Sequence, residues 1–302
     1  MPDWFGKKLI ENFCNISVEV DIASEFRYRS PIINEKTLAI FISQSGETAD
    51  TIAALKLVKE KGGKTLAITN VLGSSISRES DYVLYTKAGP EIAVASTKAY
   101  TAQVALIAKL SIEFSNALNS YSKEKLDELN QDLYKLPEQI NFVLSKSNEI
   151  KELAKQIYKE KDIYYIGRGI DYCTSMEASL KLKEISYIHS ECYAAGELKH
   201  GPIALIEDGT TVICTITDPN LIEKSVSNIQ EVITRGAKTI IITNQNIKKE
   251  NYYKVIEIPK TNSFISPILS VIPLQILAYY IAKEKNLDVD KPRNLAKSVT
   301  VE

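Results

Sequence analysis

The sequence predicts an α/β protein with two tandem domains, each built on a doubly wound parallel sheet, and three observations support this. Two pairs of segments resemble each other at one offset of 174 residues, since residues 37–43 match 211–217 and residues 61–70 match 235–244. Such a fixed offset indicates two copies of one fold. Apolar, β-branched runs also alternate with helical stretches, which is typical of parallel strands with right-handed helical crossovers. The length of 302 residues is enough for two ordinary domains.

In the first copy, we expect a helix over residues 3–13, a strand over 38–42 and a helix over 48–60. A Gly-Gly pair after the last of these suits a helix C-terminus. At the offset of the repeat, the counterpart of a later strand, 163–167, would lie before the first residue. We therefore expect the first domain to lack its opening strand. Either the chain is a shortened product or another segment takes this place in the sheet.

In the second copy, the expected order is a strand over 163–167, a helix from about Thr174, a strand over 211–216 and a helix over 222–235. Each strand is a short apolar run and each helix is longer and more polar. The longest apolar stretch, 267–282, follows them and reads as a buried helix.

A polar, helical segment over residues 119–161 joins the two copies, and Pro137 is its one evident helix breaker. We place the domain boundary near residue 145. The chain then divides into a first domain at 1–145, a second domain at 146–287 and a C-terminal tail at 288–302.

Composition argues against two classes of partner. The chain has 37 basic and 38 acidic residues, interspersed along its length, whereas a nucleic-acid binder normally shows a basic stripe. The longest apolar stretch is too short to span a membrane comfortably, and the N-terminus lacks the apolar run of a signal peptide. The four cysteines form no CxxC pair, which favours reduced thiols in a cytosolic protein and no metal site.

A cluster of hydroxyl and amide side chains follows the first predicted strand. Residues 43–48, Ser-Gln-Ser-Gly-Glu-Thr, close this strand and open a helix. At such a place backbone N–H groups and the helix dipole bind anions, and the lack of a lysine favours a monophosphate over a nucleotide. The alternative is simply a capped helix start. The matching segment of the second copy, 217–220, contains an aspartate and a proline, so we expect one anion site per chain.

Three charged residues, Glu177, Lys181 and Glu184, fall at i, i+4 and i+7 and so share one helix face. The alternative interpretation is a solvated face with ordinary salt bridges. We favour a functional role because the helix begins at the carboxyl edge of the second sheet, where doubly wound folds place ligands.

His189 and His200 are the only histidines in the sequence. A single histidine is more often structural than functional. His200 nevertheless lies in a polar, glycine-containing loop, 197–202, which suits a proton-transfer group. Lys297 lies in the tail, which composition alone would describe as an exposed end.

Five segments taken in order resemble the sugar isomerase (SIS) domains of glutamine–fructose-6-phosphate aminotransferase. They are residues 43–48, 91–98, 180–189, 194–202 and the tail at 292–302. The resemblance extends over nearly the whole chain. It is more specific than any single motif, because the five segments recur in order with matching content.

The resemblance implies a role for each candidate residue. The implied phosphate-binding residues are Ser43, Gln44, Ser45 and Thr48, and the implied sugar-lining residues are Val94 and Ser96. Lys297 would form an imine with the ketose carbonyl, and Glu184 would move a proton between C1 and C2. Lys181 and Glu177 would support that transfer. His200 would reach over from the partner subunit and open the sugar ring.

The resemblance also implies a homodimer with sites shared between subunits, and neither a metal nor an organic cofactor. The family's full-length enzyme starts with a glutaminase domain and its N-terminal cysteine, whereas residue 2 here is Pro2 and the first cysteine is Cys14. We therefore expect ammonia from another source, such as a separate glutaminase chain. The family's strand and Gly-Thr-Ser turn before the first helix are also absent from this sequence.

One main hypothesis and two alternatives follow from these features. The main hypothesis is a cytoplasmic aldose–ketose isomerase and aminotransferase module that converts fructose 6-phosphate toward glucosamine 6-phosphate, in hexosamine and cell-wall precursor biosynthesis. The alternatives are a non-catalytic sugar-phosphate sensor and a truncated, inactive remnant. The set of Glu184, His200 and Lys297 disfavours a sensor, because a sensor needs the phosphate loop but no imine-forming lysine.

Overall fold

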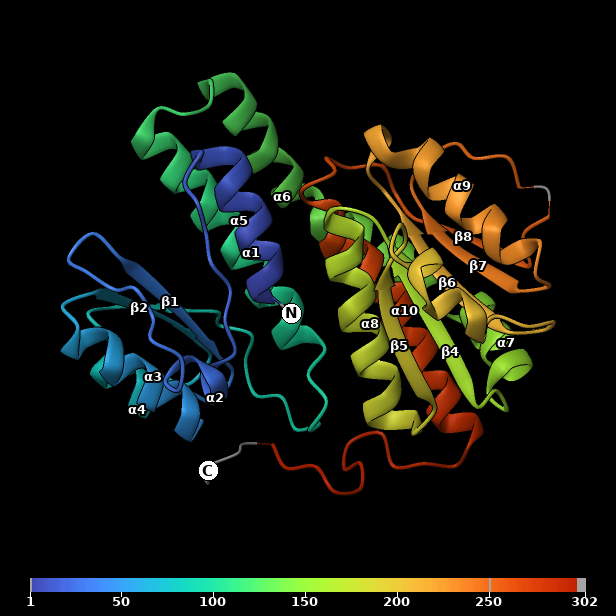
Figure 1. Cartoon of the computed structure of the whole chain (residues 1–302), viewed down its shortest axis with the longest axis horizontal. Coiled ribbons are helices and arrows are strands. Elements are labelled where there is room, and N and C mark those ends of the chain that lie inside the picture. The colour runs from blue at the N-terminus through green and yellow to red at the C-terminus, as the bar shows by residue number, and fades with distance from the viewer. Residues whose placement is uncertain (1, 250, 298–302) are drawn as a thin grey trace.

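Two parallel β-sheets organise the chain, and Figure 1 shows them as the centres of two lobes. The computed structural model describes residues 2–249 and 251–297. The first sheet comprises β1 (Leu38–Ser43), β2 (Lys64–Thr69) and β3 (Tyr82–Tyr85). The second comprises β4 (Asp162–Gly167), β5 (His189–Ala194), β6 (Thr211–Ile216), β7 (Lys238–Thr243) and β8 (Lys254–Glu257).

Helices alternate with these strands. The first part of the chain contains α1 (Pro2–Cys14), α2 (Ala23–Phe26), α3 (Ala49–Glu60), α4 (Ser75–Glu79) and α5 (Lys98–Leu118), followed by α6 (Lys123–Ser145) and α7 (Ser147–Ile157). The second part contains α8 (Ile170–Ser186), α9 (Ile222–Ile233), α10 (Ser266–Glu284) and three short 3-10 helices, η1 (Leu198–His200), η2 (Pro202–Leu205) and η3 (Pro219–Leu221). All strand pairs are parallel, so the predicted fold class is confirmed.

The two sheets share one order over three strands and then differ. The first sheet runs β1-β2-β3, which corresponds to β6-β7-β8 of the second sheet. In the second sheet β6 also pairs with β4, and β4 pairs with β5. Within the described residues, no strand pairs with the equivalent edge of β1. The expectation that the first sheet lacks its opening strand is therefore confirmed, and β1 is only partly buried while β6 is fully buried.

Strand β5 at the edge of the second sheet has no counterpart among the predicted strands. Its sequence, His-Ser-Glu-Cys-Tyr-Ala, has no apolar run, because an edge strand is covered less completely than a central one. Ala194 lies beside Gly167, so β5 and β4 end together at the carboxyl edge of the sheet.

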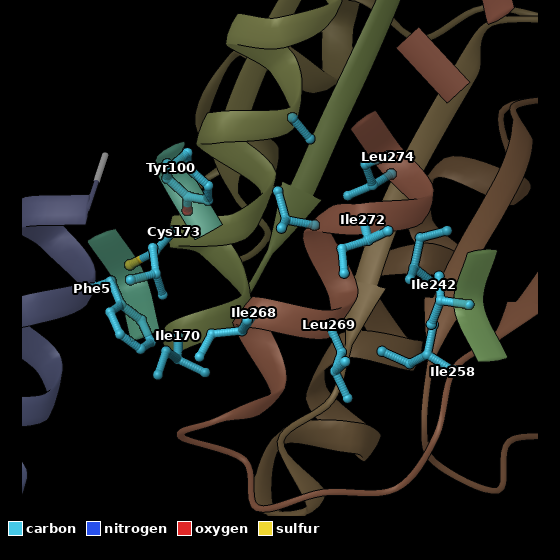
Figure 2. Packing of buried hydrophobic residues seen from close by; sticks show 14 of the residues in the cluster. Phe5, Tyr100, Ile170, Cys173, Ile242, Ile258, Ile268, Leu269, Ile272 and Leu274 are labelled. Atoms are coloured by element: carbon cyan, nitrogen blue, oxygen red, sulfur yellow. The ribbon is translucent and has the colours of Figure 1, made fainter. Parts of the chain in front are cut away.

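The two lobes share one hydrophobic core. Figure 2 shows Phe5 of α1 and Tyr100 of α5 beside Ile170 and Cys173 of α8, so helices of the first lobe pack directly on a helix of the second. Burying a large apolar side chain of this kind stabilises a fold by roughly 1.5–3 kcal/mol. The contact therefore fixes how the lobes are arranged.

Helix α10 is the apolar helix expected from the sequence. The expectation that the apolar stretch is too short to span a membrane is wrong by length and composition, because the helix extends to 19 residues, but 72% of an apolar 18-residue window of it is buried inside the protein. It packs against α8, α7 and α6. The prediction of a buried helix is confirmed.

Pro137 does not break the helical segment between the copies, contrary to expectation. Helix α6 continues through it to Ser145. Leu136 and Val143 are buried on either side of the proline, and this packing offsets the cost of the lost backbone hydrogen bond. The domain boundary near residue 145 coincides with the end of α6 and stays a prediction.

Candidate functional site

Hydrogen bonds to its own hydroxyl groups fix the conformation of the loop after β1. Ser43 Oγ accepts a hydrogen bond from the N–H of Gly46 at 3.0 Å and lies 3.4 Å from Thr48 Oγ1. Ser45 Oγ accepts from the N–H of Glu47 at 3.2 Å. Thr48 takes the N-cap position of α3. The three hydroxyls therefore gather at a helix N-terminus that follows a strand, the geometry that favours anion binding.

Gly46 is required at its position in this loop. Its φ of +69° lies in the left-handed region, and a Cβ there would clash with the Ser74 side chain and lie 2.8 Å from Ile76 Cγ2. The Gln44 side-chain oxygen is buried and has no hydrogen-bond partner among the described residues. A buried polar atom without a partner is costly, so a ligand donor would find it available.

Hydrogen bonds from Asn70 join the three loops at the carboxyl edge of the first sheet. Its N–H donates to Gln44 O at 3.3 Å, in the loop after β1. Its side-chain oxygen accepts from the N–H of Ala88 and its side-chain nitrogen donates to Gly89 O, both at 2.9 Å, in the loop after β3. The loop after β1 is therefore joined through Asn70 to the start of the loop after β3, which continues into residues 91–98.

The Glu91 carboxylate binds Lys297 at this edge. Glu91 Oε2 lies 3.1 Å from Lys297 Nζ, and the same ammonium donates to Ala93 O at 2.6 Å. The Glu91 side chain is only 5% exposed. Burial acts to raise the pKa of Glu91, but hydrogen bonds from the Thr97 backbone, the Ser96 hydroxyl and Lys297 outweigh it and lower that pKa.

The C-terminal tail passes below the second lobe in the view of Figure 1 and runs toward the first, where Lys297 meets Glu91. In the second lobe, the N–H of Arg293 donates to Tyr187 Oη at 2.8 Å, and the guanidinium lies 4.2 Å from the centre of that ring. In the first lobe, Asp290 O accepts from the N–H of Val94 at 2.9 Å. The tail is therefore a bound segment up to Lys297, and its last residues, 298–302, lie outside the described part.

The charged face of α8 is buried. Lys181 Nζ lies 3.6 Å from Glu177 Oε1 and 2.5 Å from Glu184 Oε2. The Glu177 and Lys181 side chains are 5% and 6% exposed, whereas Glu184 is 22% exposed. Burial raises the pKa of Glu177 to about 7, and Lys181 opposes the rise. An ordinary solvated face would carry neither this burial nor this raised pKa, so the solvated alternative is excluded.

The topology separates His200 from Glu184 within one chain. Helix α8 starts just after the carboxyl end of β4 and runs back, so Glu184 lies about 21 Å along the helix axis from Ile170. His200 follows the carboxyl end of β5, where the N–H of Ala195 donates to Gly167 O. The start of α8 lies at the ligand-binding edge as expected, but Glu184, near the end of the helix, lies toward the opposite edge.

The remaining histidine lies on the surface. His189 Nδ1 is 2.8 Å from Asp162 Oδ1, and the His189 side chain is 60% exposed. It starts β5, at the amino edge of the second sheet. It has no contact with the candidate residues among the hydrogen bonds of the described chain.

The equivalent loop of the second copy satisfies its donors internally. The Asp171 carboxylate accepts from the N–H of Thr217 at 2.7 Å, from the Thr217 hydroxyl and from the N–H of Asp218 at 3.4 Å. Burial raises the pKa of Asp171 to about 6, and the Thr217 hydrogen bonds oppose the rise. A carboxylate of the chain therefore lies where an anion would bind, which supports one anion site per chain.

Sequence reasoning missed two residues of this arrangement. Glu91 was visible as an acid placed before a Ser-Thr pair that opens a long helix, and Asp171 as an acid directly after a glycine-containing strand end. The Glu91 pattern is that of a carboxylate that accepts backbone N–H groups near a helix start, here those of Thr97 and Ala99, whereas Asp171 accepts from the loop after β6.

The fold and the site define a protein of two tandem parallel-sheet domains, in which strand-end loops and a bound C-terminal tail form one polar site. The family model described as SIS domain matches residues 5–112 and 156–284. The chain belongs to the SIS domain family.

Curated relatives extend this result. The chain is 57% identical over 299 residues to glutamine–fructose-6-phosphate aminotransferase [isomerizing] of Caldanaerobacter subterraneus subsp. tengcongensis, and 57% identical over 301 residues to the protein of the same name from Clostridium tetani. Each match covers 98% of this chain and 49% of the relative. The chain thus spans about half the length of these relatives.

A solved structure identifies which half is matched. The C-terminal domain of glucosamine-fructose-6-phosphate aminotransferase from Francisella tularensis is 36% identical and superposes with a TM-score of 0.93, over 96% of this chain and 82% of that one. The resemblance to the isomerase half is therefore confirmed.

Proposed function

We propose that the chain is a sugar-phosphate isomerase module that converts fructose 6-phosphate toward glucosamine 6-phosphate. The observation that carries the proposal is the position of Lys297, whose ammonium is bound to the same loop that contains Val94 and Ser96. A lysine held beside a sugar-phosphate site is suited to imine formation with a ketose. The printed names of the relatives support the choice of fructose 6-phosphate.

The phosphate group would bind to the loop after β1. Its donors are the hydroxyls of Ser43, Ser45 and Thr48 and the amide of Gln44, at the N-terminus of the 12-residue helix α3. Val94 and Ser96 would line the sugar from the loop after β3. These neutral donors and the helix dipole suit a monophosphate, and the proposal requires neither a metal nor an organic cofactor.

The chemistry would take place at C1 and C2 of the open ketose. Lys297 would first give a proton from its ammonium to solvent, Nζ would attack the C2 carbonyl carbon, and the carbonyl oxygen would leave as water. Ammonia would then replace the lysine at C2, which releases the Lys297 amine and leaves a protonated ketose imine. Glu184 would take a proton from C1, the electron pair would move into this imine, and the same carboxyl would return the proton to C2 while the C1 hydroxyl loses its proton and becomes the aldehyde. Without ammonia, the same transfer on the free C2 carbonyl would give glucose 6-phosphate. Lys181, 2.5 Å from Glu184, would stabilise its carboxylate form, and Glu177 would hold Lys181 in place.

Ring opening would require the partner subunit of a homodimer. His200 and Glu184 lie toward opposite edges of the second sheet in one chain, so His200 would reach the Glu184 site most directly from a second copy. Ammonia would come from a glutaminase domain, on this polypeptide or on a separate chain. The pathway would be amino-sugar and cell-wall precursor synthesis in the cytoplasm.

Proton NMR of fructose 6-phosphate incubated with the protein tests this function. We expect glucose 6-phosphate to appear, and glucosamine 6-phosphate when ammonium chloride is added. Glu184→Gln should abolish both products and Lys297→Ala should abolish glucosamine 6-phosphate, whereas Lys249→Ala, which removes a surface lysine paired with Glu257, should change neither. Unchanged formation of glucosamine 6-phosphate by Lys297→Ala would overturn the proposal.

A further inference from the structure

Glu91 is the charged group that holds Lys297 in the described structure. Its two carboxylate oxygens have separate partners: Oε2 lies 3.1 Å from Lys297 Nζ, while Oε1 accepts from the backbone N–H groups of Thr97 at 2.9 Å and Ala99 at 3.4 Å. We propose that Glu91 positions Lys297 for imine formation by fixing the tail lysine on the sugar-lining loop. This inference rests on the proposed function.

The asymmetry of the pair indicates which residue positions the other. The Glu91 side chain is 5% exposed and is fixed by the backbone at the start of α5, whereas the Lys297 side chain is 33% exposed and belongs to an irregular tail. A buried carboxylate without a cation is strongly unfavourable. The buried, backbone-bound carboxylate therefore attracts the more exposed ammonium, although the two residues are 206 positions apart in the sequence.

The same carboxylate suits the next stage of the reaction. When Lys297 Nζ forms the protonated imine, the positive charge stays on the same nitrogen, so Glu91 can pair with it as it pairs with the ammonium. A positively charged imine has the more electrophilic C2, to which ammonia must add before the lysine is released. Because its hydrogen bonds outweigh burial and lower its pKa, Glu91 stays ionised and acts as a positioning residue.

Trapping of the imine with sodium cyanoborohydride tests this role. The protein is incubated with fructose 6-phosphate and the reductant, and the rate of adduct formation at Lys297 is measured by peptide mass spectrometry. Glu91→Gln keeps an oxygen for the Thr97 N–H but removes the charge, and Glu91→Asp keeps the charge on a shorter side chain. Glu257→Gln is the matched control, since it removes a carboxylate from a surface lysine pair of 2.6 Å.

We expect labelling of Glu91→Gln to be about tenfold slower than wild type, as for loss of one charge-assisted hydrogen bond. Glu91→Asp should be intermediate and Glu257→Gln unchanged, and thermal stabilisation by fructose 6-phosphate should persist in all three. Labelling of Glu91→Gln at the wild-type rate would overturn the inference.

Two other outcomes of this experiment would also overturn the proposed role of Glu91. If the wild type is stabilised by fructose 6-phosphate but Lys297 is never labelled, the imine itself is wrong and this inference falls with it. If Glu91→Gln does not give a cooperative melt, the rate of Lys297 labelling is compared between Glu91→Asp and the wild type instead. Labelling of Glu91→Asp at the wild-type rate would then overturn the role of Glu91.

Discussion

Ser45 lies in the middle of the proposed phosphate loop, where a negative charge would repel a phosphate. We predict that fructose 6-phosphate raises the melting temperature of the protein while fructose does not, with a gain of about 2.7 kcal/mol at a hundredfold excess over Kd. Ser45→Asp should abolish the gain, and Ser227→Asp, on the exposed face of α9, should keep it. The measurement is thermal denaturation with each sugar. A full gain in Ser45→Asp would remove the loop from the site.

Gly46 and Gly73 form a matched pair, because both have a φ of +69° but different surroundings. Nothing lies within 4 Å of a Cβ built at Gly73, whereas one at Gly46 meets Ser74 and Ile76. Gly73→Ala should therefore cost about 1 kcal/mol from backbone strain alone. Gly46→Ala should cost about 1–3 kcal/mol more from the clash. Urea denaturation measures both, and equal losses would show that the loop around Gly46 adapts freely.

Glu177 should make stability depend on pH. Its pKa is raised from 4.5 to about 7 in the folded protein, so the folded state holds the proton more tightly. The stabilisation that Glu177 gives the folded state is fully present below about pH 4.5 and is lost as the pH rises through about 7. Between these values the free energy of unfolding falls by roughly 1.4 kcal/mol per pH unit. Glu177→Gln should therefore gain stability relative to wild type between pH 5 and 8. A difference between the two proteins that is constant with pH would contradict this assignment.

At the residue scale, the sequence predicted side chains whose chemistry is local. Ser43, Ser45 and Thr48 gather because a strand-to-helix turn brings neighbours together. The pairing of Glu91 with Lys297 and of Asp171 with Thr217 was missed because these partners lie 206 and 46 residues away in the sequence. Only the folded chain brings such carboxylates to their donors.

At the scale of elements, the free edge of β1 should weaken the first sheet. Strand β1 pairs with β2 alone in the described chain, whereas its counterpart β6 pairs with both β4 and β7. Backbone N–H groups with one covered side exchange faster. We predict faster hydrogen exchange in β1 than in β6, while β2 and β7, each between two strands, differ less. Equal protection of β1 and β6 would show that the missing neighbour has no effect on local stability.

Element boundaries followed from the sequence wherever burial is complete. The strand over 211–216 was predicted at its observed limits, since every residue of β6 is buried and apolar or β-branched. The edge strand β5 was missed because half-exposed strands need no apolar run. Pro137 was misread because tertiary packing along α6 outweighs the local preference of one residue.

At the scale of the whole molecule, the arrangement of the lobes depends on contacts that no local pattern specifies. Helices α1 and α5 pack on each other and on α8, and the tail links Tyr187 to Glu91 across both lobes. The repeat predicted two similar domains but not this interface. The position of Glu184 toward the amino edge of the second sheet likewise follows from the length of α8.

The central claim, a site shared between two subunits, is tested most directly by mixing two inactive variants. Provided that the wild-type chain forms glucosamine 6-phosphate when ammonium chloride is added, His200→Ala and Lys297→Ala homodimers should each be nearly inactive in this reaction, because every site lacks one group. After subunit exchange, half of the dimers are mixed and each has one intact site, so about a quarter of wild-type activity should return. Tagged pull-down confirms the exchange. Mixed dimers that form without any recovery of activity would contradict the shared site.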